Sequence, residues 1–357
     1  MKVAVYSIAK NESLHVERWA NSASDADGIF LTDTGSTDNT VALANTLGIE
    51  TSVISISPWR FDDARNASLA QIPNDFDFCI CLDLDEILIP GWRRELEKAF
   101  ERGVTRPSYS YLWSVGSDGL PSTSFNGNKI HMRHGYRWKY AIHEILVPDR
   151  IAEKSEWVNL EIHHLPDSTK SRSEYLPLLQ TSVKENPGDS RLSYYLGREY
   201  FFANESQLAI VELKRYLALG DYCWGPERSS ALRMLGRLDF DNAEKWFLEA
   251  IDAAPHHREG YVALANLYFQ KEYWPQVFHF ANLALEITVR NGDFITDPES
   301  WGYLPHDLCA ISAFNLKNSM IAIKQGKLAL DKAPESERAR LEKNLDFYLG
   351  ENQTLRT

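Results

Sequence analysis

Short apolar runs alternate with amphipathic stretches along the first part of the chain. The runs at 3–8, 28–32, 51–56 and 76–84 predict strands, and the stretches at 12–20, 40–47 and 62–70 predict helices. The run at 76–84 is nearly all apolar, which is typical of a strand covered on both faces. Strands that alternate with helices indicate βαβ units and a largely parallel sheet. The Gly-x-Gly-x-x-Gly fingerprint of dinucleotide sites does not follow the first strand.

The pattern changes twice further along the chain. From about 108 to 164, aromatic and β-branched runs lie among Gly, Ser and Asn turns, which predicts a mixed, partly antiparallel extension. After Leu165-Pro166-Asp167 the pattern is helical to the last residue. We therefore expect an α/β domain over residues 1–166 and an all-α domain over residues 167–357.

The helical part has an internal period. Pro187, Asp221 and Pro255 are spaced by 34 residues, which is the length of a tetratricopeptide helix–turn–helix unit. Pro334 lies two periods plus 11 residues after Pro255, and the loop at 291–305 can hold the 11 additional residues. Small and aromatic residues recur at matching positions: Leu196, Gly197, Tyr200 and Ala209; Ala243, Phe247 and Ala250; Tyr261, Leu264, Ala265 and Tyr268; Ala310, Ala322 and Ala329. The second repeat lacks a recognisable first half, and a non-repetitive helical bundle is the alternative.

Composition narrows the class of protein. The 357 residues carry a net charge of −12, so the long-range field repels nucleic acid. No run approaches the roughly 20 apolar residues of a membrane helix, and the run at 3–8 is too short for a signal peptide. We expect a soluble, cytoplasmic protein without a membrane span. Four cysteines, Cys79, Cys81, Cys223 and Cys309, lack zinc-site spacing and are expected to be small core residues.

The first candidate for chemistry is Asp83-Leu84-Asp85-Glu86, at the end of the run 76–84. Strand alternation would put Asp83 and Asp85 on one side and turn Glu86 away. Two carboxylates in an apolar setting repel each other, and a hard divalent cation removes that cost and can hold a diphosphate. A helix N-cap or a solvated turn is the alternative. The location favours a ligand site, because parallel sheets bind ligands at the carboxyl ends of their strands.

Two further stretches point to the same edge of the sheet. Asp33 begins the turn-rich stretch 33–40 after the second strand, where it could bind a base or ribose; a well-capped βα loop is the alternative. Arg65, on the helix at 62–70, could reach a diphosphate or the acidic strand end. A surface arginine paired with Asp62 is the alternative there.

A fourth stretch lies in the β-like extension. His143-Glu144 ends an aromatic run at 138–142, and His163-His164 follow about twenty residues later. A carboxylate beside a sugar site can serve as general base on an acceptor. A histidine from the second pair could complete a metal shell.

In this order and spacing, the motifs resemble family 2 glycosyltransferases of the GT-A fold. The motifs are Ala9-Lys10-Asn11-Glu12, the stretch 33–40, the stretch 61–66, Asp83 to Glu86 and Ile142-His143-Glu144. The subgroup resembled has tetratricopeptide-like repeats behind the catalytic domain, as do the peptide S-glycosyltransferases of bacteriocin pathways. The resemblance covers residues 1 to about 165 and, more loosely, the repeats.

The resemblance implies a role for each matching residue. Donor-binding residues would be Asn11, Glu12, Asp33, Arg65 and Asp83; Asp85 and His164, with His163 as the alternative, would bind Mn²⁺ or Mg²⁺; Glu144, beside His143, would be the catalytic base. Many family members place the base in a Glu-Asp pair, whereas this chain has His143-Glu144, so the identity of the base stays open.

The implied activity is an inverting, metal-dependent transfer from a nucleotide sugar, a UDP-sugar above all, to a peptide, protein or glycan that the repeats would hold. The repeats could also form a homodimer. A hydroxylated DNA base is an alternative acceptor, since Arg133, Arg137 and Lys139 form a local basic cluster. A non-enzymatic scaffold with an inactive transferase domain is the alternative of another class. A sugar-nucleotide pyrophosphorylase would need a Gly-rich basic loop where Ala9-Lys10-Asn11-Glu12 lies.

Overall fold

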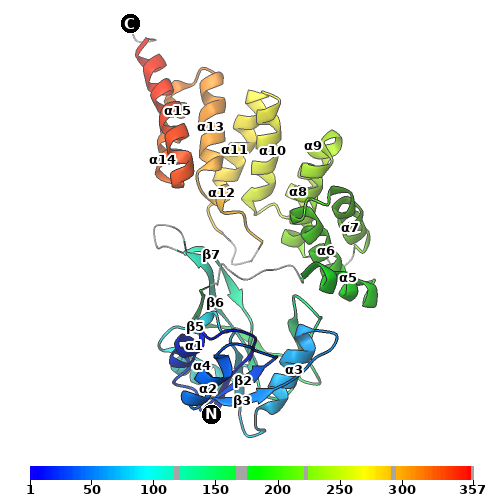
Figure 1. Ribbon diagram of the computed structural model, residues 1–357. Helices are drawn as coiled ribbons and strands as arrows, with labels where there is room; N and C mark the ends of the chain where they lie inside the picture. Colours follow the sequence, from blue (N-terminus) through cyan, green and yellow to red (C-terminus); the bar gives the residue numbers. More distant parts are fainter. Residues whose placement is uncertain (116–120, 166–174, 221–223, 291–294, 355–357) are drawn as a thin grey trace. The chain divides into compact units, whose positions relative to one another are not determined.

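The computed structural model of the chain describes residues 1–115, 121–165, 175–220, 224–290 and 295–354 (Figure 1). The chain forms two compact units, one over Met1–Ser182 and a second that begins at Val183, inside helix α5 (Tyr175–Glu185). The predicted boundary at 166/167 lies outside the described residues. An α/β unit followed by an all-α unit agrees with the predicted fold class.

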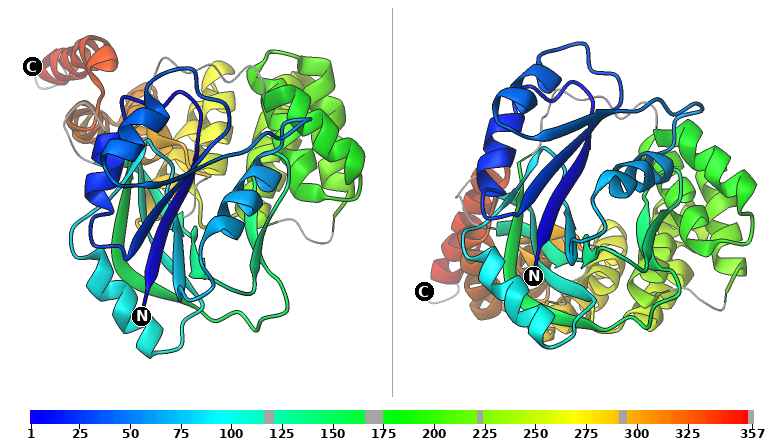
Figure 2. Two further views of the ribbon diagram at one scale, coloured as in Figure 1. Left: turned by 60° about the horizontal axis from the view of Figure 1, so that its bottom comes forward. Right: turned by 90° about the horizontal axis from the view of Figure 1, so that it is seen from below.

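A five-stranded sheet forms the middle of the first unit, with strand order β3-β2-β1-β4-β8. The strands β1 (Val3–Ala9), β2 (Gly28–Asp33), β3 (Glu50–Val53) and β4 (Phe78–Cys81) are parallel, and β8 (Ile130–Met132) runs antiparallel to β4. Figure 2 shows β1 and β2, in dark blue, side by side. The strand order reverses between β1 and β4, and ligands of open α/β sheets bind at the carboxyl ends of such a switch point.

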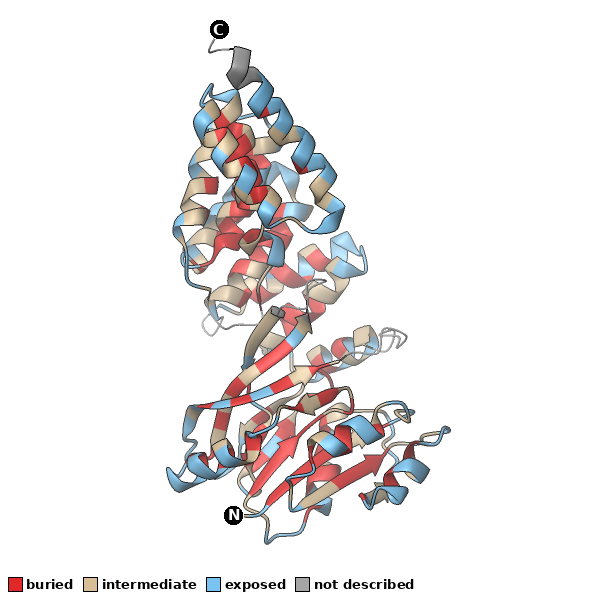
Figure 3. Cartoon of the chain, turned by 90° about the vertical axis from the view of Figure 1, so that its left-hand side faces the viewer, coloured by how far each residue is buried: buried red, intermediate tan, exposed pale blue. Residues whose placement is uncertain are grey.

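Both faces of this sheet are covered, because alternate β1 residues point to opposite sides. Val3 and Val5 pack into one buried cluster with Trp19 of helix α1 (Val16–Ser22). Ala4 and Tyr6 pack into another cluster with Leu69 of helix α3 (Phe61–Gln71). Helix α2 (Thr40–Thr46) adds Ala44 to the first cluster. The strands are largely red, that is buried, in Figure 3.

The predicted mixed extension is a second sheet with strand order β5-β11-β6-β7. Its strands are β5 (Glu86–Leu88), β6 (Arg106–Val115), β7 (Pro121–Gly127) and β11 (Ser155–His164), and only β6 and β11 pair in parallel. The sequence pattern missed helix α4 (Trp92–Glu101), which packs on β11. A separate hairpin joins β9 (Tyr136–Lys139) to β10 (Ile145–Pro148).

The second unit consists of antiparallel helix pairs of tetratricopeptide-like length. The pairs are α6 (Ser190–Phe202) with α7 (Ser206–Ala218), α8 (Gly225–Leu238) with α9 (Ala243–Ala253), α10 (Arg258–Gln270) with α11 (Trp274–Glu286), and α13 (Leu304–Asn315) with α14 (Ser319–Asp331), followed by α15 (Glu335–Thr354). The short elements η1 (Phe240–Asn242) and α12 (Pro298–Trp301) lie between helices of this series. The segment expected to hold the 11 residues beyond two periods lies between α11 and α13. Asp221 of the predicted period lies outside the described residues.

The second repeat does have a first half, which corrects the expectation from the sequence. Helix α8 begins at Gly225-Pro226 and buries Ala231, Leu232 and Leu235, so its apolar face is intact. The first helices of successive pairs pack on one another, α6 on α8, α8 on α10 and α10 on α13. These helices therefore form one continuous row along the unit.

Small residues permit the close approach within the pairs α6/α7 and α8/α9. A Cβ on Gly197 would lie 2.8 Å from Leu213, and one on Gly236 would lie 2.4 Å from a Phe247 ring carbon. Cys79, Cys81 and Cys309 are buried free thiols, as expected, and Cys223 lies outside the described residues. No helix in the described parts of the chain has the length and apolarity needed to cross a bilayer.

Candidate active site

The loops that follow β1 and β2 are bonded to each other at the carboxyl edge of the sheet. Asn11 has left-handed backbone, with φ of 58°. Its Oδ1 accepts the Thr37 N–H at 2.7 Å, and its own N–H donates to Ser36 Oγ at 2.9 Å. The Glu12 N–H donates to Thr40 Oγ1 at 2.7 Å. Asn11 and Glu12 therefore help to form this edge of the sheet.

Asp33 is buried and organises its own loop. Its Oδ2 accepts the backbone N–H groups of Gly35 and Ser36, both at 3.0 Å. Gly35 supplies the positive φ, 107°, that this tight turn requires. This is the arrangement of a well-capped βα loop, and a contact between Asp33 and a nucleoside stays a prediction.

The acidic stretch forms a turn, not the end of a strand. β4 ends at Cys81, and the Glu86 N–H donates to the Asp83 carbonyl at 2.9 Å. The Glu86 carboxylate folds back to accept the Asp83 N–H at 2.9 Å. The expectation that Asp83 and Asp85 share one side and Glu86 turns away is therefore wrong, because strand alternation ends with the strand.

Arg65 connects the acidic turn to the stretch that contains Glu144. Its Nη1 donates to Asp83 Oδ1 at 2.8 Å, and its Nε donates to Glu144 Oε1 at 2.6 Å. The guanidinium lies over the Trp138 ring at 5.2 Å, and its side chain is only 7% exposed. Burial opposes the charge, but Asp83, Cys81 and Glu144 raise the pKa of Arg65 well above its ordinary value. Arg65 is thus a buried member of the site.

The alternative for Arg65, a surface pair with Asp62, is wrong. Asp62 instead pairs with Arg60, whose Nε lies 3.2 Å from its Oδ1. The Asn66 side chain donates to the Trp138 carbonyl at 2.9 Å and accepts the Trp138 N–H at 2.8 Å. These two bonds fix α3 against β9, so the strand that carries Trp138 is held under Arg65.

Lys129 is a site residue that the sequence did not indicate. Its Nζ donates to Asp83 Oδ2 at 2.8 Å and to Glu86 Oε1 at 2.6 Å, and Tyr111 donates its hydroxyl to the same Glu86 oxygen at 2.5 Å. Burial would raise the pKa of Asp83, but Arg65 and Lys129 hold it well below its ordinary value. Burial raises the pKa of Glu86, and the Lys129 charge opposes that rise only in part.

The pairing of β8 with β4 explains the position of Lys129. Ile130 lies opposite Ile80, and the Cys81 N–H donates to the Lys129 carbonyl at 3.1 Å. Lys129 therefore lies beside the carboxyl end of β4, next to the acidic turn. A lone lysine after a turn gives no signal of this pairing in the sequence.

Asp85 faces away from this ion-pair cluster and toward β11. Its Oδ2 lies 3.4 Å from His164 Nε2. His164 Nδ1 bonds the Trp113 carbonyl at 3.1 Å, and the two rings stack at 4.2 Å. Burial lowers the pKa of His164, but the Asp85 bond and the Trp113 carbonyl raise it above its ordinary value. His163 instead lies 3.2 Å from Glu161, at the surface.

The pair Asp85–His164 fits two neighbouring positions in the shell of one divalent ion. If His164 Nδ1–H donates to the Trp113 carbonyl, Nε2 carries the lone pair that a metal needs. The described residues include no group of three or more His, Cys, Asp or Glu side chains arranged as a metal site. An ion here would take its other ligands from water and a substrate, as Mg²⁺ commonly does.

The charges of the cluster also fit a divalent ion. Asp83, Glu86 and Glu144 are in direct contact with Arg65 and Lys129. Asp85 contacts His164 instead, so with His164 neutral it adds a fourth negative charge to a site that has two positive ones. A divalent cation would neutralise the remainder, so the donor set and the charge agree.

The stretch that contains Glu144 has unusual backbone. Tyr140 and His143 have φ of 82° and 50°, and bulky residues rarely adopt such values. Backbone of this kind is often found at functional sites. The His143 ring lies edge-on to Tyr175, with centroids 6.1 Å apart. Glu144 gives one oxygen to Arg65, and its other oxygen is the candidate for proton transfer.

The expected basic cluster is only partly available to a ligand. The Arg133 guanidinium donates twice to the Ile72 carbonyl, at 3.1 and 2.7 Å. Lys139 donates to the Tyr140 hydroxyl at 3.1 Å and lies over that ring. Arg137 is exposed. The support for a nucleic-acid acceptor is correspondingly small.

Relatives of known class match part of the chain. No family profile matches it. Over 100 residues, 28% of the chain, it is 32% identical to an uncharacterized glycosyltransferase of Rickettsia bellii, and the match covers 33% of that protein. It is 34% identical over 100 residues to one of Rickettsia conorii, which covers 28% of the chain and 34% of that protein. The chain thus spans about a third of the curated relatives it matches, and over that stretch the predicted resemblance to glycosyltransferases is confirmed.

Solved structures match at low TM-scores. The match to TarS of S. aureus covers 68% of this chain and 54% of the TarS chain, at 13% identity and a TM-score of 0.41. TTC0263, a TPR protein of Thermus thermophilus, covers 48% and 90%, at 18% identity and 0.36. Glucosyl-3-phosphoglycerate synthase of Mycobacterium tuberculosis, solved with Mn²⁺ and UDP, covers 31% and 44%, at 24% identity and 0.27.

Proposed function

We propose that the chain is a metal-dependent, inverting glycosyltransferase that uses a nucleotide-sugar donor, a UDP-sugar above all. The observation that carries the proposal is the convergence of Asp83 and Glu144 on Arg65, beside the Asp85–His164 pair. These residues come from separate stretches of the chain and meet at the switch point of the sheet. The similarity to rickettsial glycosyltransferases supports the same activity.

Each residue of the cluster has a chemical task in this proposal. Asp85 and His164 would hold Mn²⁺ or Mg²⁺, which neutralises charge on a departing diphosphate. Arg65 and Lys129 each bind one oxygen of Asp83 and keep it ionised and fixed. A carboxylate oxygen has more than one lone pair, so Asp83 can still accept a hydroxyl of the ribose or the sugar. Asn11, Glu12 and Asp33 would line the nucleoside end, as the resemblance implies.

The transfer itself is a single displacement. The acceptor hydroxyl or thiol gives its proton to the second oxygen of Glu144 while the acceptor atom bonds to the anomeric carbon. The bond from that carbon to the diphosphate breaks, and the nucleoside diphosphate leaves with the electron pair. One in-line displacement inverts the anomeric centre. His143 precedes the base and would fix its backbone.

Nucleotide binding tests the proposal before any acceptor is known. We expect UDP to raise the melting temperature in manganese buffer and not in EDTA, because ligand that binds the folded state alone stabilises it. Asp85→Asn should abolish the manganese-dependent shift and keep the ligand-free melting temperature. A panel of sugar nucleotides would then identify the donor. If calorimetry detects no nucleotide binding to the wild type with manganese present, the proposal is wrong.

A further inference from the structure

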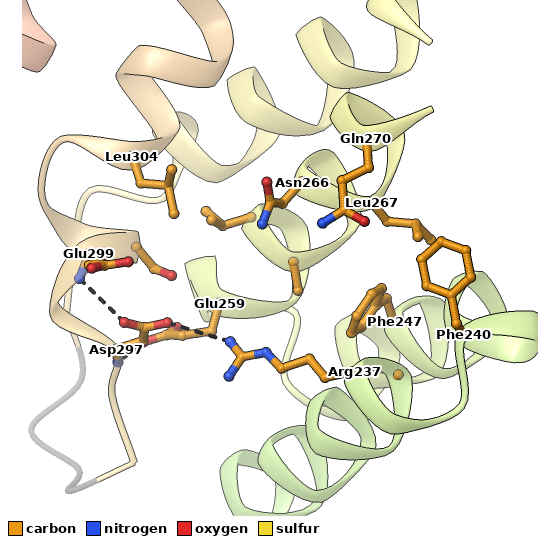
Figure 4. A pocket seen from close by; sticks show the side chains of 14 residues that line it. Arg237, Phe240, Phe247, Glu259, Asn266, Leu267, Gln270, Asp297, Glu299 and Leu304 are labelled. Atoms are coloured by element: carbon orange, nitrogen blue, oxygen red, sulfur yellow. Dashed lines mark hydrogen bonds and ion pairs between the residues drawn. The ribbon is translucent and has the colours of Figure 1, made fainter. Parts of the chain in front are cut away.

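The helical unit has a hollow of about 290 Å³ whose charged side chains serve packing (Figure 4). Arg237 of α8 lies 3.9 Å from Asp297, which precedes α12. Glu259 of α10 is buried and accepts the indole N–H of Trp301, in α12, at 3.0 Å. These contacts hold α12 against α8 and α10. The buried polar side chains of the first unit, by contrast, reach the candidate active site.

Tyr6, His131 and Trp138 form a chain of hydrogen bonds inside the first unit. The Trp138 indole N–H donates to the Tyr6 hydroxyl oxygen at 2.8 Å, and that oxygen lies 3.1 Å from His131 Nε2. His131 Nδ1 lies 2.8 Å from the Met132 carbonyl oxygen. Because the three side chains are buried, each of these polar groups needs a partner within the protein.

The chemistry of the groups sets the direction of each bond. A carbonyl oxygen can only accept, so His131 Nδ1 carries a proton and Nε2 of the neutral ring accepts. Burial lowers the pKa of His131 to about 4, although the Met132 carbonyl opposes this shift, so the ring is neutral at ordinary pH. Tyr6 therefore donates its proton to His131 and keeps its oxygen for the Trp138 N–H. Since an indole N–H can only donate, the chain of bonds has one consistent arrangement.

This arrangement fixes the ring of Trp138 in addition to its backbone. The two bonds from Asn66 hold the Trp138 backbone, but the χ2 angle of an indole is broad and lets the ring turn. A turned ring would leave the buried indole N–H without an acceptor, which costs the desolvation free energy of that group. The Tyr6 hydroxyl thus selects one orientation of the ring.

The ring of Trp138 in turn supports Arg65. The Arg65 guanidinium lies over this ring at 5.2 Å, and its Nη1 also donates to Cys81 Sγ at 3.0 Å. Cys81 of β4 lies opposite Tyr6 of β1, so Tyr6 lies beside one contact of the guanidinium and orients another. The same guanidinium binds the two carboxylates on either side of the site. A turn of the ring would therefore displace the group that both carboxylates share.

We propose that Tyr6 is a positioning residue of the active site: its hydroxyl orients Trp138, and Trp138 orients Arg65 between Asp83 and Glu144. The inference rests on the proposed transferase for its effect on the rate, and it deepens that proposal by adding a residue from the middle of β1. The hold of the hydroxyl on Arg65 requires no sugar transfer, so it can be tested separately.

Tyr6→Phe removes the hydroxyl and keeps the ring, and Tyr136→Phe is its matched control. Tyr136 belongs to the same buried cluster as Tyr6, but its hydroxyl bonds Thr105 Oγ1 at 2.8 Å. We expect both variants to lose stability, because each loses one buried hydrogen bond. Tyr6→Phe should also slow transfer on the order of tenfold or more, since small displacements of reacting groups are costly, whereas Tyr136→Phe should keep the wild-type rate. The rate in Tyr6→Phe should fall more than the affinity for UDP in manganese buffer.

A double-mutant cycle tests the hold on Arg65 without any activity measurement. Denaturant unfolding of the full chain is compared for Tyr6→Phe, Arg65→Lys and the double variant, because a lysine cannot lay a planar group on the Trp138 ring. If Tyr6 acts on Arg65 through Trp138, the double variant should lose clearly less stability than the two single losses together. The same cycle with Tyr136→Phe should be additive. Additive losses in both cycles would overturn the inference.

The remaining outcomes are also decisive. A wild-type transfer rate in Tyr6→Phe contradicts the inference. Should Tyr6→Phe fail to fold, Trp138→Phe keeps an aromatic ring beneath the guanidinium but has no N–H, and a folded Trp138→Phe with the wild-type rate overturns the inference. Coupled losses in a protein that binds no UDP with manganese present would contradict the proposed transferase and still support the hold of Tyr6 on Arg65. UDP binding together with additive losses would contradict this inference alone.

Discussion

Arg65 Nε donates to Glu144 Oε1 at 2.6 Å, although 79 residues separate the two in the chain. Through Nη1 the same guanidinium donates to Asp83 at 2.8 Å. A group that serves both carboxylates fixes the distance between the acidic turn and the candidate base. In the proposed reaction Asp83 lies on the donor side and Glu144 on the acceptor side, so Arg65 would set the distance between the two carboxylates.

Arg65→Lys tests this relationship. A lysine ammonium is a point charge on a flexible stem and cannot replace a planar fork that holds two carboxylates. We expect a loss of about 1–3 kcal/mol in unfolding free energy, because one buried carboxylate loses its partner, and at least a tenfold fall in transfer rate. Arg60→Lys is the control, since its pairs with Asp62 and Asp63 are more exposed and should cost less than about 1 kcal/mol. Equal losses in the two variants would argue against a special role for Arg65.

Lys129→Met should destabilise the fold in a pH-dependent way. It leaves Asp83 and the buried Glu86 adjacent without their shared ammonium, and loss of one partner of a buried pair costs about 3–5 kcal/mol near neutral pH. The pKa of Glu86 is already raised, so its charged form is the disfavoured one in the folded state. Acidification should protonate Glu86 in the variant and shrink the deficit, because its pKa is raised.

In the wild type, by contrast, the pKa of Asp83 is lowered. Its contribution to stability is therefore complete above the ordinary aspartate pKa and is lost as the pH falls through the lower folded value. Denaturant unfolding of the wild type, Lys129→Met and Lys129→Arg across this range checks both signs. Lys129→Arg keeps the charge and should lose much less unfolding free energy than Lys129→Met. A loss of stability in Lys129→Met that grows on acidification would contradict the ion-pair account.

Local patterns in the sequence indicated most elements of the first sheet and the repeat length. The short apolar runs located β1 and β2 to within a residue, because buried parallel strands need continuous apolar runs. The acidic turn was found because charged residues at the end of an apolar strand are conspicuous, whereas Arg65 was noted on the helix predicted at 62–70. The 34-residue spacing predicted the helix pairs, since each pair must bury small residues against its neighbour.

What the sequence missed depends on long-range pairing. Lys129 takes its place from the register of β8 on β4, and Glu86 turns inward because β4 ends at Cys81. Neither fact is encoded in residues adjacent in the chain. The bonds of Tyr6 have the same origin: its two side-chain partners lie 125 and 132 residues further along the chain, and only the folded unit brings them to β1.

His164→Ala and His163→Ala form a matched pair for the metal. His164 lies 3.4 Å from Asp85, whereas His163 lies beside Glu161 at the surface. We expect His164→Ala to weaken manganese binding by about 10–100-fold and to reduce the UDP-induced thermal shift, and His163→Ala to leave both unchanged. Calorimetric titration with Mn²⁺ alone measures the first effect. Equal affinity in all three proteins would remove His164 from the metal shell.

Gly236→Ala tests the packing of the second helix pair. A Cβ there would lie 2.4 Å from Phe247, whereas one on Gly188 would meet nothing within 4 Å. Overpacking of this kind typically costs about 1–3 kcal/mol. We therefore expect Gly236→Ala to lower the unfolding free energy of the helical unit and Gly188→Ala to leave it nearly unchanged, in denaturant titrations followed by circular dichroism. A neutral Gly236→Ala would mean that α8 and α9 pack less closely.

Glu144→Gln separates the two tasks that the site gives to this side chain. A glutamine can still accept the Arg65 N–H through its amide oxygen but cannot take a proton from an acceptor. If Glu144 is the base, UDP binding in manganese buffer should stay within about threefold of the wild type while the rate of transfer falls by about 100-fold or more. Glu144→Gln also removes one negative charge beside Arg65. Arg65→Lys is therefore a useful comparison, because it disturbs the contact between Arg65 and Glu144 but leaves the Glu144 carboxylate in place. A slow Glu144→Gln variant that loses nucleotide binding in parallel would make Glu144 a residue that positions Arg65, and the base would have to be sought elsewhere.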